Sequence, residues 1–583
     1  MRKFSVSLFT LLALVASCRA STRPGVGASN IPPRSSVVFP SGWRFASGGQ
    51  AAFGEHFMIA SNQGLASEAG NEIIRAGGNA VDAAVAVGFA LAVVYPRAGN
   101  IGGGGFMVIR MADGRTAAID YREVAPLAAS RDMYLDKNGN PTMESIIGYR
   151  ASGVPGSVAG MTEALAKYGG KSLKEVMAPA IRLARDGFVV DSAFFSSLTG
   201  SKSYLARFEG VKMLYPGGDP LKPGTLFRQP ALARTLQLIA DGGAPAFYHG
   251  EIADSLIAGM QRGGGILTKA DLAAYKPEWR QPITSGYRGY TLLTMPPASS
   301  GGITITETLN MLEAIGPASP WGSTRWAHIM ASVYQRAFID RNSKIADPAF
   351  VKVPMDELTS KEYARKLART IDPARRTPTP PHGTQIVDGQ STTHYSVVDD
   401  QGNAVATTTT LNNGYGSGVY LTNVGFFMND EMDDFAAAPG KPNMFGLVQG
   451  EANAIAPGKR MLSAMSPTIV LDPKGEVLLV VGAAGGPRII TTTAQIILNV
   501  LDQKMSLFDA MHAPRLHHQA LPDTLMVETN GLSIAVRDSL LAMGHAVSFT
   551  NGLANANAVM RVKGGWEGVS EPRSSGTGGT SSR

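Results

Sequence analysis

Threonine hydroxyls are concentrated in two neighbouring segments of the chain, and a hydroxyl can act as a nucleophile when a base activates it. The β-branched runs 392–398 and 404–410 flank a polar turn, which is the pattern of a β-hairpin. If the turn centres on Gln401, Thr392 faces Thr410 across the strand pair, whereas a bulge in the turn would shift the register by one residue. The sequence therefore predicts two facing threonine hydroxyls.

Thr392 needs a base before it can attack a substrate. His394, two residues along the same strand face, is awkwardly placed for that task. The amine of a chain's own N-terminus can serve instead, because an α-amino group has a pKa of about 7.7 to 8.0. Thr392 would gain such an amine if its hydroxyl attacked the carbonyl of Ser391 and the resulting ester were hydrolysed. Judged by residue types alone, a purely structural threonine-rich strand remains the alternative.

Two groups of residues raise the question of a metal site. The segment 430–434 holds four carboxylates, which repel one another unless they are solvated, bound to a metal or facing a cation. An EF-hand calcium loop needs alternate acidic positions and a glycine that this segment lacks. The histidines His512, His517 and His518 fit neither the HExxH nor the C2H2 spacing of zinc sites. We therefore expect no metal.

The glycine run 102–105 could be taken for a phosphate-binding loop. Such a loop lies between a strand and a helix and carries a Lys-Ser/Thr pair, and this run has neither feature. Close packing of the backbone is the prediction, and no cofactor is expected.

The segment 390–399 closely resembles the processing site of the γ-glutamyltranspeptidases, a family of threonine-type N-terminal-nucleophile hydrolases. The resemblance runs from about Met58 to Arg573. Further matching segments are residues 77–84, 102–106, 120–126, 433–435, 465–468 and 485–490. The resemblance implies an α+β fold, a four-layer αββα sandwich, and a chain that cuts itself between Ser391 and Thr392.

The resemblance also implies catalytic roles. Thr392 corresponds to the nucleophile and new N-terminus, and Thr410 to the residue that positions it by a hydrogen bond. Gly485 and Gly486 correspond to the oxyanion hole, where backbone amides stabilise the charge of the tetrahedral intermediate.

The implied substrate-binding residues form a receptor for a free amino-acid end. Arg122 corresponds to the arginine that binds the α-carboxylate, although outside this family a surface salt bridge with Glu123 would be the default interpretation. Glu431 and Asp434 are implied to hold the α-ammonium group. Two further implied contacts are Asn412, expected two residues beyond Thr410 on the same strand face, and Ser463 at the carboxylate.

Two positions depart from the family pattern. Ala464 stands where many relatives have a second serine, so one hydrogen bond to the carboxylate, worth about 1.5 to 3 kcal/mol, is absent unless another group replaces it. The segment from Pro439 to Asn453 resembles a lid over the site, and Phe445 stands where some relatives have tyrosine.

These residues must be positioned by elements from both halves of the chain. Apolar spacing and glycine or proline stops predict helices at 66–76, 80–94, 171–187 and 491–502, and interrupted helices over 301–369. Strands are predicted at 106–111, 392–398, 404–410, 468–472 and 477–482. Helices followed by strands indicate a layered α+β protein that folds as one unit. The proline-rich stretch 373–383 is predicted to be exposed and mobile.

Composition excludes several classes of protein. The chain has 583 residues, of which 44% are hydrophobic, with 67 Gly and 35 Pro, so it is neither collagen nor a low-complexity polymer. The net charge of +7 is dispersed, which argues against nucleic acid as a partner. The single cysteine excludes an intramolecular disulfide and a thiolate metal cluster.

That cysteine lies near the N-terminus. Residues 1–17 combine a basic start with a short apolar stretch, the layout of a secretory signal. Small residues before Cys18 resemble a bacterial lipobox, which predicts cleavage before a lipidated Cys18; the alternative is ordinary cleavage after Ala20. Residues 18–57 are predicted to be a flexible tether. We therefore expect an exported, periplasmic protein, anchored to a membrane through its lipid.

The resemblance implies two chains that stay together as a heterodimer, a large subunit of residues 58–391 and a small subunit of residues 392–583. Their expected partners are glutathione and other γ-glutamyl compounds as donors, with water, amino acids or peptides as acceptors. Two alternatives remain, namely an acylase or poly-γ-glutamate-cleaving enzyme of the same fold, and an inactive substrate-binding lipoprotein.

Overall fold

The computed structural model describes residues 37–379, 392–574 and 578–582. Cys18, the predicted signal segment and Ser391 lie outside these ranges. Among the described residues, no helix is both long and apolar enough to cross a membrane.

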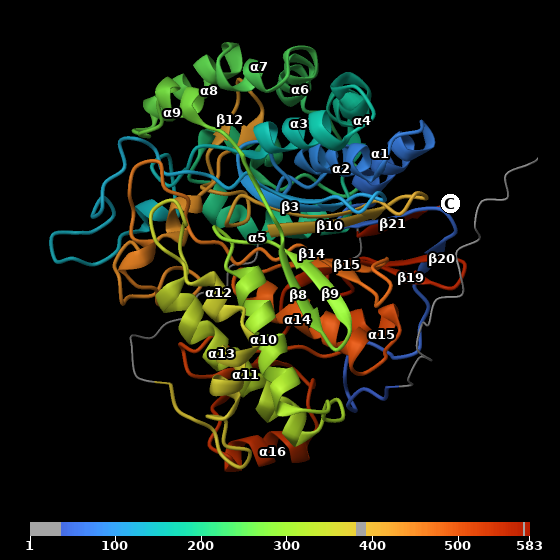
Figure 1. The fold of residues 1–583 in the computed structure, drawn as a ribbon. Coiled ribbons are helices and arrows are strands. Elements are labelled where there is room, and N and C mark those ends of the chain that lie inside the picture. Colours follow the sequence, from blue (N-terminus) through green and yellow to red (C-terminus); the bar gives the residue numbers. More distant parts are fainter. Residues whose placement is uncertain (1–36, 380–391, 575–577, 583) are drawn as a thin grey trace, which may run out of the picture.

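Two antiparallel seven-stranded sheets lie face to face at the centre of the molecule (Figure 1). The first sheet has the order β21 (Gly579–Ser582), β2 (Met58–Ser61), β10 (Thr392–Val398), β11 (Ala404–Thr410), β3 (Gly104–Arg110), β4 (Thr116–Asp120) and β7 (Glu278–Arg280). The second has the order β1 (Ala52–Gly54), β20 (Gly565–Val569), β19 (Asn555–Val562), β15 (Val477–Ala484), β14 (Thr468–Leu471), β9 (Tyr290–Thr294) and β8 (Ile283–Tyr287).

Helices cover the outer face of each sheet (Figure 1). Those over the first sheet are α1 (Gly64–Arg75), α2 (Ala80–Val94), α3 (Ser157–Tyr168), α4 (Leu173–Asp186), α6 (Pro230–Gly242), α7 (Ala244–Tyr248), α8 (Glu251–Arg262) and α9 (Lys269–Ala274). Those on the side of the second sheet are α10 (Gly301–Ile315), α11 (Thr324–Lys344), α12 (Met355–Leu358), α13 (Lys361–Ala368), α14 (Arg488–Leu501), α15 (Leu507–His512) and α16 (Ile534–Ala542). The predicted four-layer αββα sandwich is confirmed.

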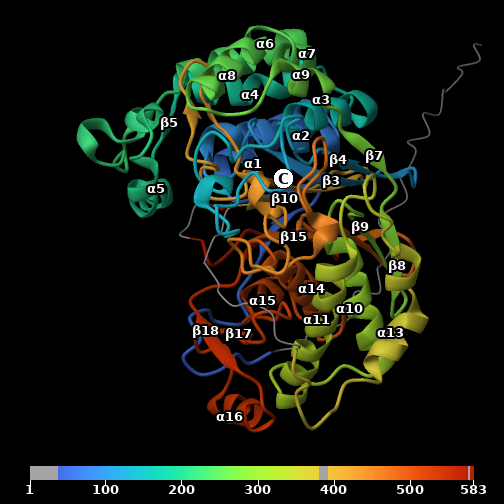
Figure 2. The same cartoon turned by 90° about the vertical axis from the view of Figure 1, so that its left-hand side faces the viewer.

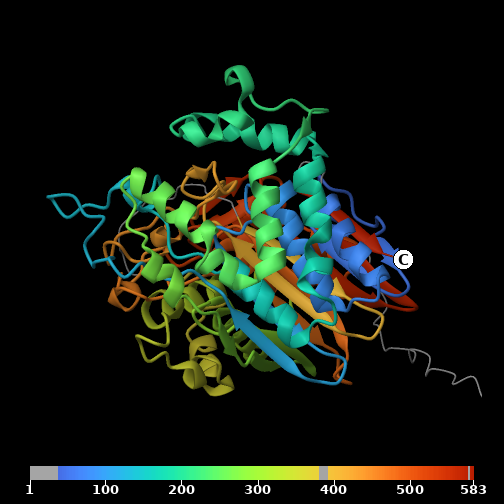
Figure 3. The same cartoon turned by 90° about the horizontal axis from the view of Figure 1, so that it is seen from above.

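Shorter elements decorate this sandwich. Helix α5 (Ser192–Leu205) and the strand pair β5 (Phe188–Val189) and β6 (Leu226–Phe227) form an arm that extends from the first helical layer (Figures 2 and 3). The remaining strands are β12 (Tyr420–Leu421), β13 (Phe426–Phe427), β16 (Leu516–His517), β17 (Leu525–Glu528) and β18 (Val547–Thr550).

The two helices predicted at 66–76 and 80–94 are confirmed, the second at its predicted bounds. Asn79 and Asp82 form a capping box that begins α2, and the whole of this helix is buried against the first sheet. Helix α1 ends at Arg75, and Gly77 just beyond it has a φ of +84°, which suits glycine. The amides of Gly77 and Gly78 donate hydrogen bonds to carbonyls of the last helical turn.

The β10–β11 hairpin has the register expected from the sequence. Thr392 is paired with Thr410, and the pairing continues without a bulge to the turn. The Asp399 carboxylate closes that turn by accepting hydrogen bonds from the amides of Gln401 (3.0 Å) and Asn403 (2.9 Å). The hairpin therefore lies at the centre of the first sheet, between β2 and β3.

The glycine run 102–105 packs closely against backbone, as predicted. A Cβ atom on Gly103 would collide with the carbonyl oxygen of Thr410, and one on Gly102 with that of Phe427. The run therefore lets β3 approach the end of β11 that carries Thr410.

Residues 37–57 differ from the predicted tether. Residues 52–54 form β1 at the edge of the second sheet, the Trp43 indole donates to the carbonyl of His512 (3.0 Å), and Phe39 is buried. A few aromatic side chains hold this segment against the rest of the fold. Composition does not reveal them, because glycine, serine and proline residues dominate the segment. The start of the proline-rich stretch 373–383, predicted to be mobile, also contacts the fold, because Gln335 donates a hydrogen bond to the carbonyl of Thr377 (2.7 Å).

Glu307 on α10 is a buried carboxyl group whose oxygens have no hydrogen-bond partner among the described residues. Burial raises the pKa of Glu307 well above its usual value, and the neighbouring Asp340 adds to this. Because its pKa is raised, the folded state retains a proton that the unfolded state releases above about pH 4.3. The stability of the fold is therefore not reduced by Glu307 below that pH and falls as the pH rises above it.

We therefore expect Glu307→Gln to stabilise the fold at pH 8 and to have a much smaller effect at pH 4.5, where the carboxyl group of the unfolded chain is itself largely protonated. Thermal unfolding of both proteins at the two pH values measures this difference. A stabilisation of equal size at both pH values would contradict the buried, protonated state of Glu307.

Candidate active site

Thr392 and Thr410 lie at one end of the central hairpin, on the edge of a cavity. Their hydroxyl oxygens are 3.2 Å apart, and Thr392 is buried with 7% of its surface exposed. Thr410 is itself held in place, because its hydroxyl accepts a hydrogen bond from the Asn412 amide (2.8 Å) and its carbonyl one from the Asn100 side chain (2.8 Å). The two hydroxyls predicted to face each other are thus in hydrogen-bond contact.

The His394 side chain makes its hydrogen bonds to residues other than Thr392. Its Nδ1 is 2.9 Å from the Thr408 hydroxyl and its Nε2 is 3.0 Å from the Ser396 hydroxyl. Burial lowers its pKa to about 3, so the imidazole is neutral. Both ring nitrogens are engaged, and His394 is therefore not placed to take a proton from Thr392.

Gly485 and Gly486 connect β15 to α14, next to the hydroxyl pair. Their φ angles of +137° and +58° lie in the region that favours glycine. Gly486 lines the cavity, and a Cβ atom there would come within 2.8 Å of the Phe445 ring. Gly485 packs against Ala554 instead. Gly486 therefore lies on the same cavity as Thr392, just before the N-terminus of α14, where positive potential favours a developing oxyanion.

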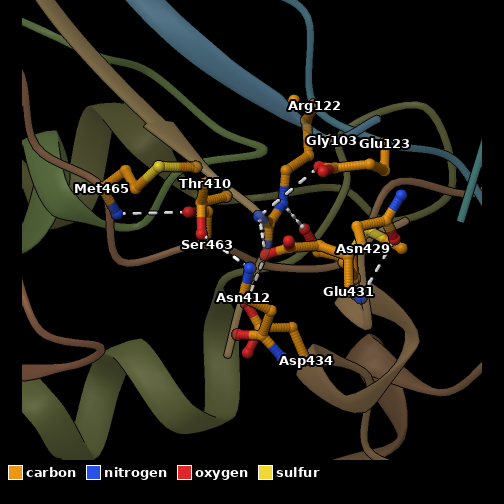
Figure 4. Close-up of polar contacts among 12 residues, drawn as sticks. Gly103, Arg122, Glu123, Thr410, Asn412, Asn429, Glu431, Asp434, Ser463 and Met465 are labelled. Carbon is orange, nitrogen blue, oxygen red and sulfur yellow. Dashed lines mark hydrogen bonds and ion pairs between the residues drawn. The ribbon is translucent and has the colours of Figure 1, made fainter. Parts of the chain in front are cut away.

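Arg122, Glu431 and Asp434 form a buried ion-pair network beside the cavity (Figure 4). Arg122 follows β4, and its Nη1 and Nη2 donate to the carboxylates of Glu431 and Asp434, which lie on a single helical turn, Glu431–Asp434. Glu123 is 3.7 Å from the same guanidinium. The structure therefore brings the predicted residues together, in direct contact with one another.

Burial sets the electrostatics of this network. Desolvation raises the pKa of Glu431 well above its usual value and that of Glu123 to about 7, while Arg122 opposes both shifts. The pKa of Asp434 is also raised by burial and held down by Arg122. A second cation bound beside these carboxyl groups would lower their pKa values, because a positive charge favours the ionised form.

Asn412 and Ser463 also line the cavity. Asn412 is not on the strand face expected from the sequence, because β11 ends at Thr410 and Asn412 has a φ of +76°. This turn directs its side chain to the carbonyl of Asp430, 3.0 Å away. The Ser463 hydroxyl accepts a hydrogen bond from the Met465 amide (3.1 Å; Figure 4).

The segment that resembles a lid forms part of the cavity wall. Phe445 and Leu447 of that segment line it and are buried, and the amide of Met444 donates to Asp433 (3.1 Å). Ala464 also lines the cavity, so the hydroxyl that a second serine would place there is absent.

Arg341 is a lining residue that sequence analysis missed. It lies on α11, 69 positions upstream of Thr410 in a helix that is buried over much of its length, and no local motif marks it. A positively charged residue within the apolar helical pattern predicted over 301–369 is the signal that could have drawn attention to it.

The histidines have structural partners. His517 Nδ1 is 2.9 Å from the Thr491 hydroxyl, and its Nε2 is 2.9 Å from the Gln519 side chain. His512 Nδ1 is 2.7 Å from the carbonyl of Phe508. Within residues 37–379, 392–574 and 578–582, no group of three or more His, Cys, Asp or Glu side chains is arranged to hold a metal ion.

Two stacked antiparallel sheets between helical layers, with a threonine at the start of a central strand, define the fold of the N-terminal-nucleophile hydrolases. A family model described as gamma-glutamyltranspeptidase matches residues 66–581. The chain belongs to the γ-glutamyltranspeptidase family.

Known proteins are similar to this chain, in sequence or in structure, over most of their own length. A glutathione hydrolase proenzyme of Escherichia coli K12 is 47% identical over 525 residues, which cover 89% of this chain and 90% of that protein. The crystal structure of a cephalosporin acylase from Bacillus halodurans has a TM-score of 0.81 at 26% identity, covering 93% of this chain and 99% of the other. A Helicobacter pylori γ-glutamyltranspeptidase structure has a TM-score of 0.54 at 42% identity, covering 57% of this chain and 95% of the other.

Proposed function

We propose that this protein is a self-processing γ-glutamyltransferase and glutathione hydrolase. The observation that carries the proposal is the Thr392–Thr410 hydroxyl pair on one cavity with the Arg122, Glu431 and Asp434 network. Family membership and the similarity to a glutathione hydrolase proenzyme support it.

Processing begins with attack of the Thr392 hydroxyl on the carbonyl carbon of Ser391. The C–N bond of the Ser391–Thr392 peptide breaks, an ester forms on the Thr392 oxygen, and the nitrogen takes up the proton. Water then hydrolyses the ester, which leaves a carboxylate on Ser391 and a free amine on Thr392. Thr410 positions the attacking oxygen through the 3.2 Å contact.

The two chains remain one folded unit after this cut. Strands β2, β3, β4 and β7 come from residues 58–391, while β10, β11 and β21 come from residues 392–583, and all seven share the first sheet. Strand β10 pairs with β2 on one side and β11 on the other, so the new N-terminus is held within the sheet. A stable heterodimer of the two chains follows.

Turnover uses the new amine as the base. It accepts the proton of the Thr392 hydroxyl, whose oxygen attacks the γ-carbonyl carbon of the donor. The amides of Gly485 and Gly486 stabilise the oxyanion, the amine returns the proton to the leaving group, and a γ-glutamyl ester forms on Thr392. Water or the amino group of an acceptor amino acid or peptide then attacks that ester.

The charged network suits a donor with a free amino-acid end. A γ-linked glutamyl group leaves both its α-ammonium and its α-carboxylate free, and Glu431 and Asp434 receive the ammonium. Binding of this cation stabilises the ionised carboxylates that burial disfavours.

A same-fold acylase is the second candidate function. The similarity to a cephalosporin acylase and the apolar Ala464 at the cavity favour it, because an acyl group without an α-amino acid needs fewer polar contacts. A poly-γ-glutamate-cleaving enzyme and an inactive binding lipoprotein are the remaining alternatives.

We also propose that the protein is exported and held in the periplasm by a lipid on Cys18. The basic and apolar residues 1–17 and the small residues before the cysteine support this proposal. Mass spectrometry of the mature N-terminus tests it, since an unmodified start at Ser21 would rule out the lipid anchor.

The activity is tested by denaturing electrophoresis together with release of anilide from L-γ-glutamyl and glutaryl anilides. The proposal expects two bands and preferential use of the γ-glutamyl donor. Two bands with preference for the glutaryl donor would identify the acylase, and two bands without turnover of either donor would favour the binding protein.

A further inference from the structure

Asp430 is a fully buried carboxyl group that takes no part in the processing and turnover steps described above. Its Oδ1 accepts a hydrogen bond from the Asn413 amide (2.8 Å), and its Oδ2 has no hydrogen-bond partner among the described residues. A buried carboxylate oxygen that carries charge without a partner is costly, and protonation removes that charge. The contacts of Asp430 therefore fit a neutral carboxyl group.

The charged and titratable groups around Asp430 favour the same state. They are three further acids of its own segment and a tyrosine of the arm, namely Glu431, Asp433, Asp434 and Tyr204. Burial and the neighbouring acids raise the pKa of Asp430 well above its usual value, while the Asn413 amide opposes the shift. In its neutral form the side chain resembles that of asparagine, with one acceptor oxygen and one donor group.

Asp430 holds the chain directly after β11 through three hydrogen bonds. Its carboxyl group accepts from the Asn413 amide, its carbonyl accepts from the Asn412 side chain (3.0 Å), and its amide donates to the carbonyl of Leu411 (3.0 Å). Asn412 has a φ of +76°, a conformation that is unfavourable for residues other than glycine. In this conformation the Asn412 amide donates to the Thr410 hydroxyl (2.8 Å). The contacts of Asp430 thus support the turn that holds this hydroxyl.

We propose that Asp430, with its carboxyl group neutral, is a positioning residue that holds the turn 411–413 and, through it, the Thr410 hydroxyl against Thr392. This inference rests on the proposed function, in which Thr410 positions the attacking oxygen. Asp430 acts from behind the site, because it does not line the cavity in the part of the chain that the structure describes. When the carboxyl contact is lost, the strained turn relaxes and both self-cleavage and turnover slow down.

Variants at both ends of the β10–β11 hairpin test this assignment. Asp430→Ala and Asp430→Ser remove the acceptor for the Asn413 amide, whereas Asp430→Asn keeps an acceptor in an uncharged group of the same size. Asp399→Ala is the matched control, because Asp399 also accepts turn amides, from Gln401 and Asn403, at the other end of the hairpin. Self-cleavage is followed during cell-free translation, and kcat and KM of the processed fraction are measured with an L-γ-glutamyl anilide.

We expect Asp430→Ala and Asp430→Ser to slow self-cleavage and to lower kcat by about 10- to 100-fold, with a smaller change in KM, as for reacting groups that are displaced. Asp430→Asn keeps both rates near those of wild type. Asp399→Ala lowers the melting temperature without lowering kcat. Wild-type rates in either variant that lacks the acceptor would overturn the positioning role, and an Asp430→Asn protein as slow as these two would overturn the neutral state.

The protonation state of Asp430 is measured separately, by NMR of protein labelled with ¹³C at the aspartate carboxyl carbons. The signal that is missing from Asp430→Asn belongs to Asp430, and we expect it at the position of a protonated carboxyl group at pH 7. A signal at the position of a carboxylate would overturn the neutral state whatever the activity. Wild-type protein that cleaves itself but releases no anilide would instead overturn the proposed function, while the self-cleavage rates still decide the role of Asp430.

Discussion

Thr392→Ala is expected to leave one uncut chain with no γ-glutamyltransferase or hydrolase activity. The variant lacks both the hydroxyl that attacks Ser391 and the hydroxyl that forms the γ-glutamyl ester, so processing and turnover fail together. Denaturing electrophoresis and anilide release measure the two losses, and loss of the nucleophile lowers the rate by at least about 10³-fold. A Thr392→Ala protein that still splits into two chains would show that Thr392 is not the nucleophile.

Thr393→Val is the matched control for this experiment. Thr393 is the next residue of β10, is fully buried, and its hydroxyl has no hydrogen-bond partner among the described residues. Because successive side chains of a strand point to opposite faces, Thr393 lies on the other face of the sheet from Thr392. We expect Thr393→Val to be processed and active, which separates loss of the nucleophile from a general disturbance of the strand.

Arg122→Met is expected to destabilise the fold strongly at alkaline pH. The substitution leaves Glu431 and Asp434 buried without the cation that pairs with both, and breaking a buried ion pair costs about 3 to 5 kcal/mol. Without Arg122 the folded pKa values of these carboxyl groups rise further above their unfolded values. Stability is then retained below the unfolded pKa of about 4 and is lost as the pH rises.

Thermal unfolding of wild type, Arg122→Met and Arg122→Lys at pH 8 and pH 5 measures this effect. We expect a larger loss of melting temperature for Arg122→Met at pH 8 than at pH 5, and a smaller loss for Arg122→Lys, which keeps the charge. If the loss in Arg122→Met were independent of pH, the carboxylates would not be the cause.

Much of the fold could be predicted from local sequence. The bounds of α2, β10 and β11 match the predicted segments because an asparagine cap, a following proline and a polar turn mark them directly. The segment 37–57 could not be predicted in this way, since its order depends on a few aromatic side chains that pack on distant helices and strands. Composition alone does not contain such contacts.

The residues of the candidate site likewise differ in how far the sequence alone predicted their arrangement. By itself, the sequence determined the facing of Thr392 and Thr410, because strand register follows from the turn and has a period of two. It also marked Arg122, Glu431 and Asp434 through the family resemblance, but not their direct contact.

Only the tertiary structure decided which charges face one another. Arg341 lies on a helix far along the chain from the acidic segment and reaches the cavity because α11 packs in the layer beyond the second sheet. The physical reason is that Coulomb energies and desolvation depend on distance and burial in space, and residues far apart in the sequence set both.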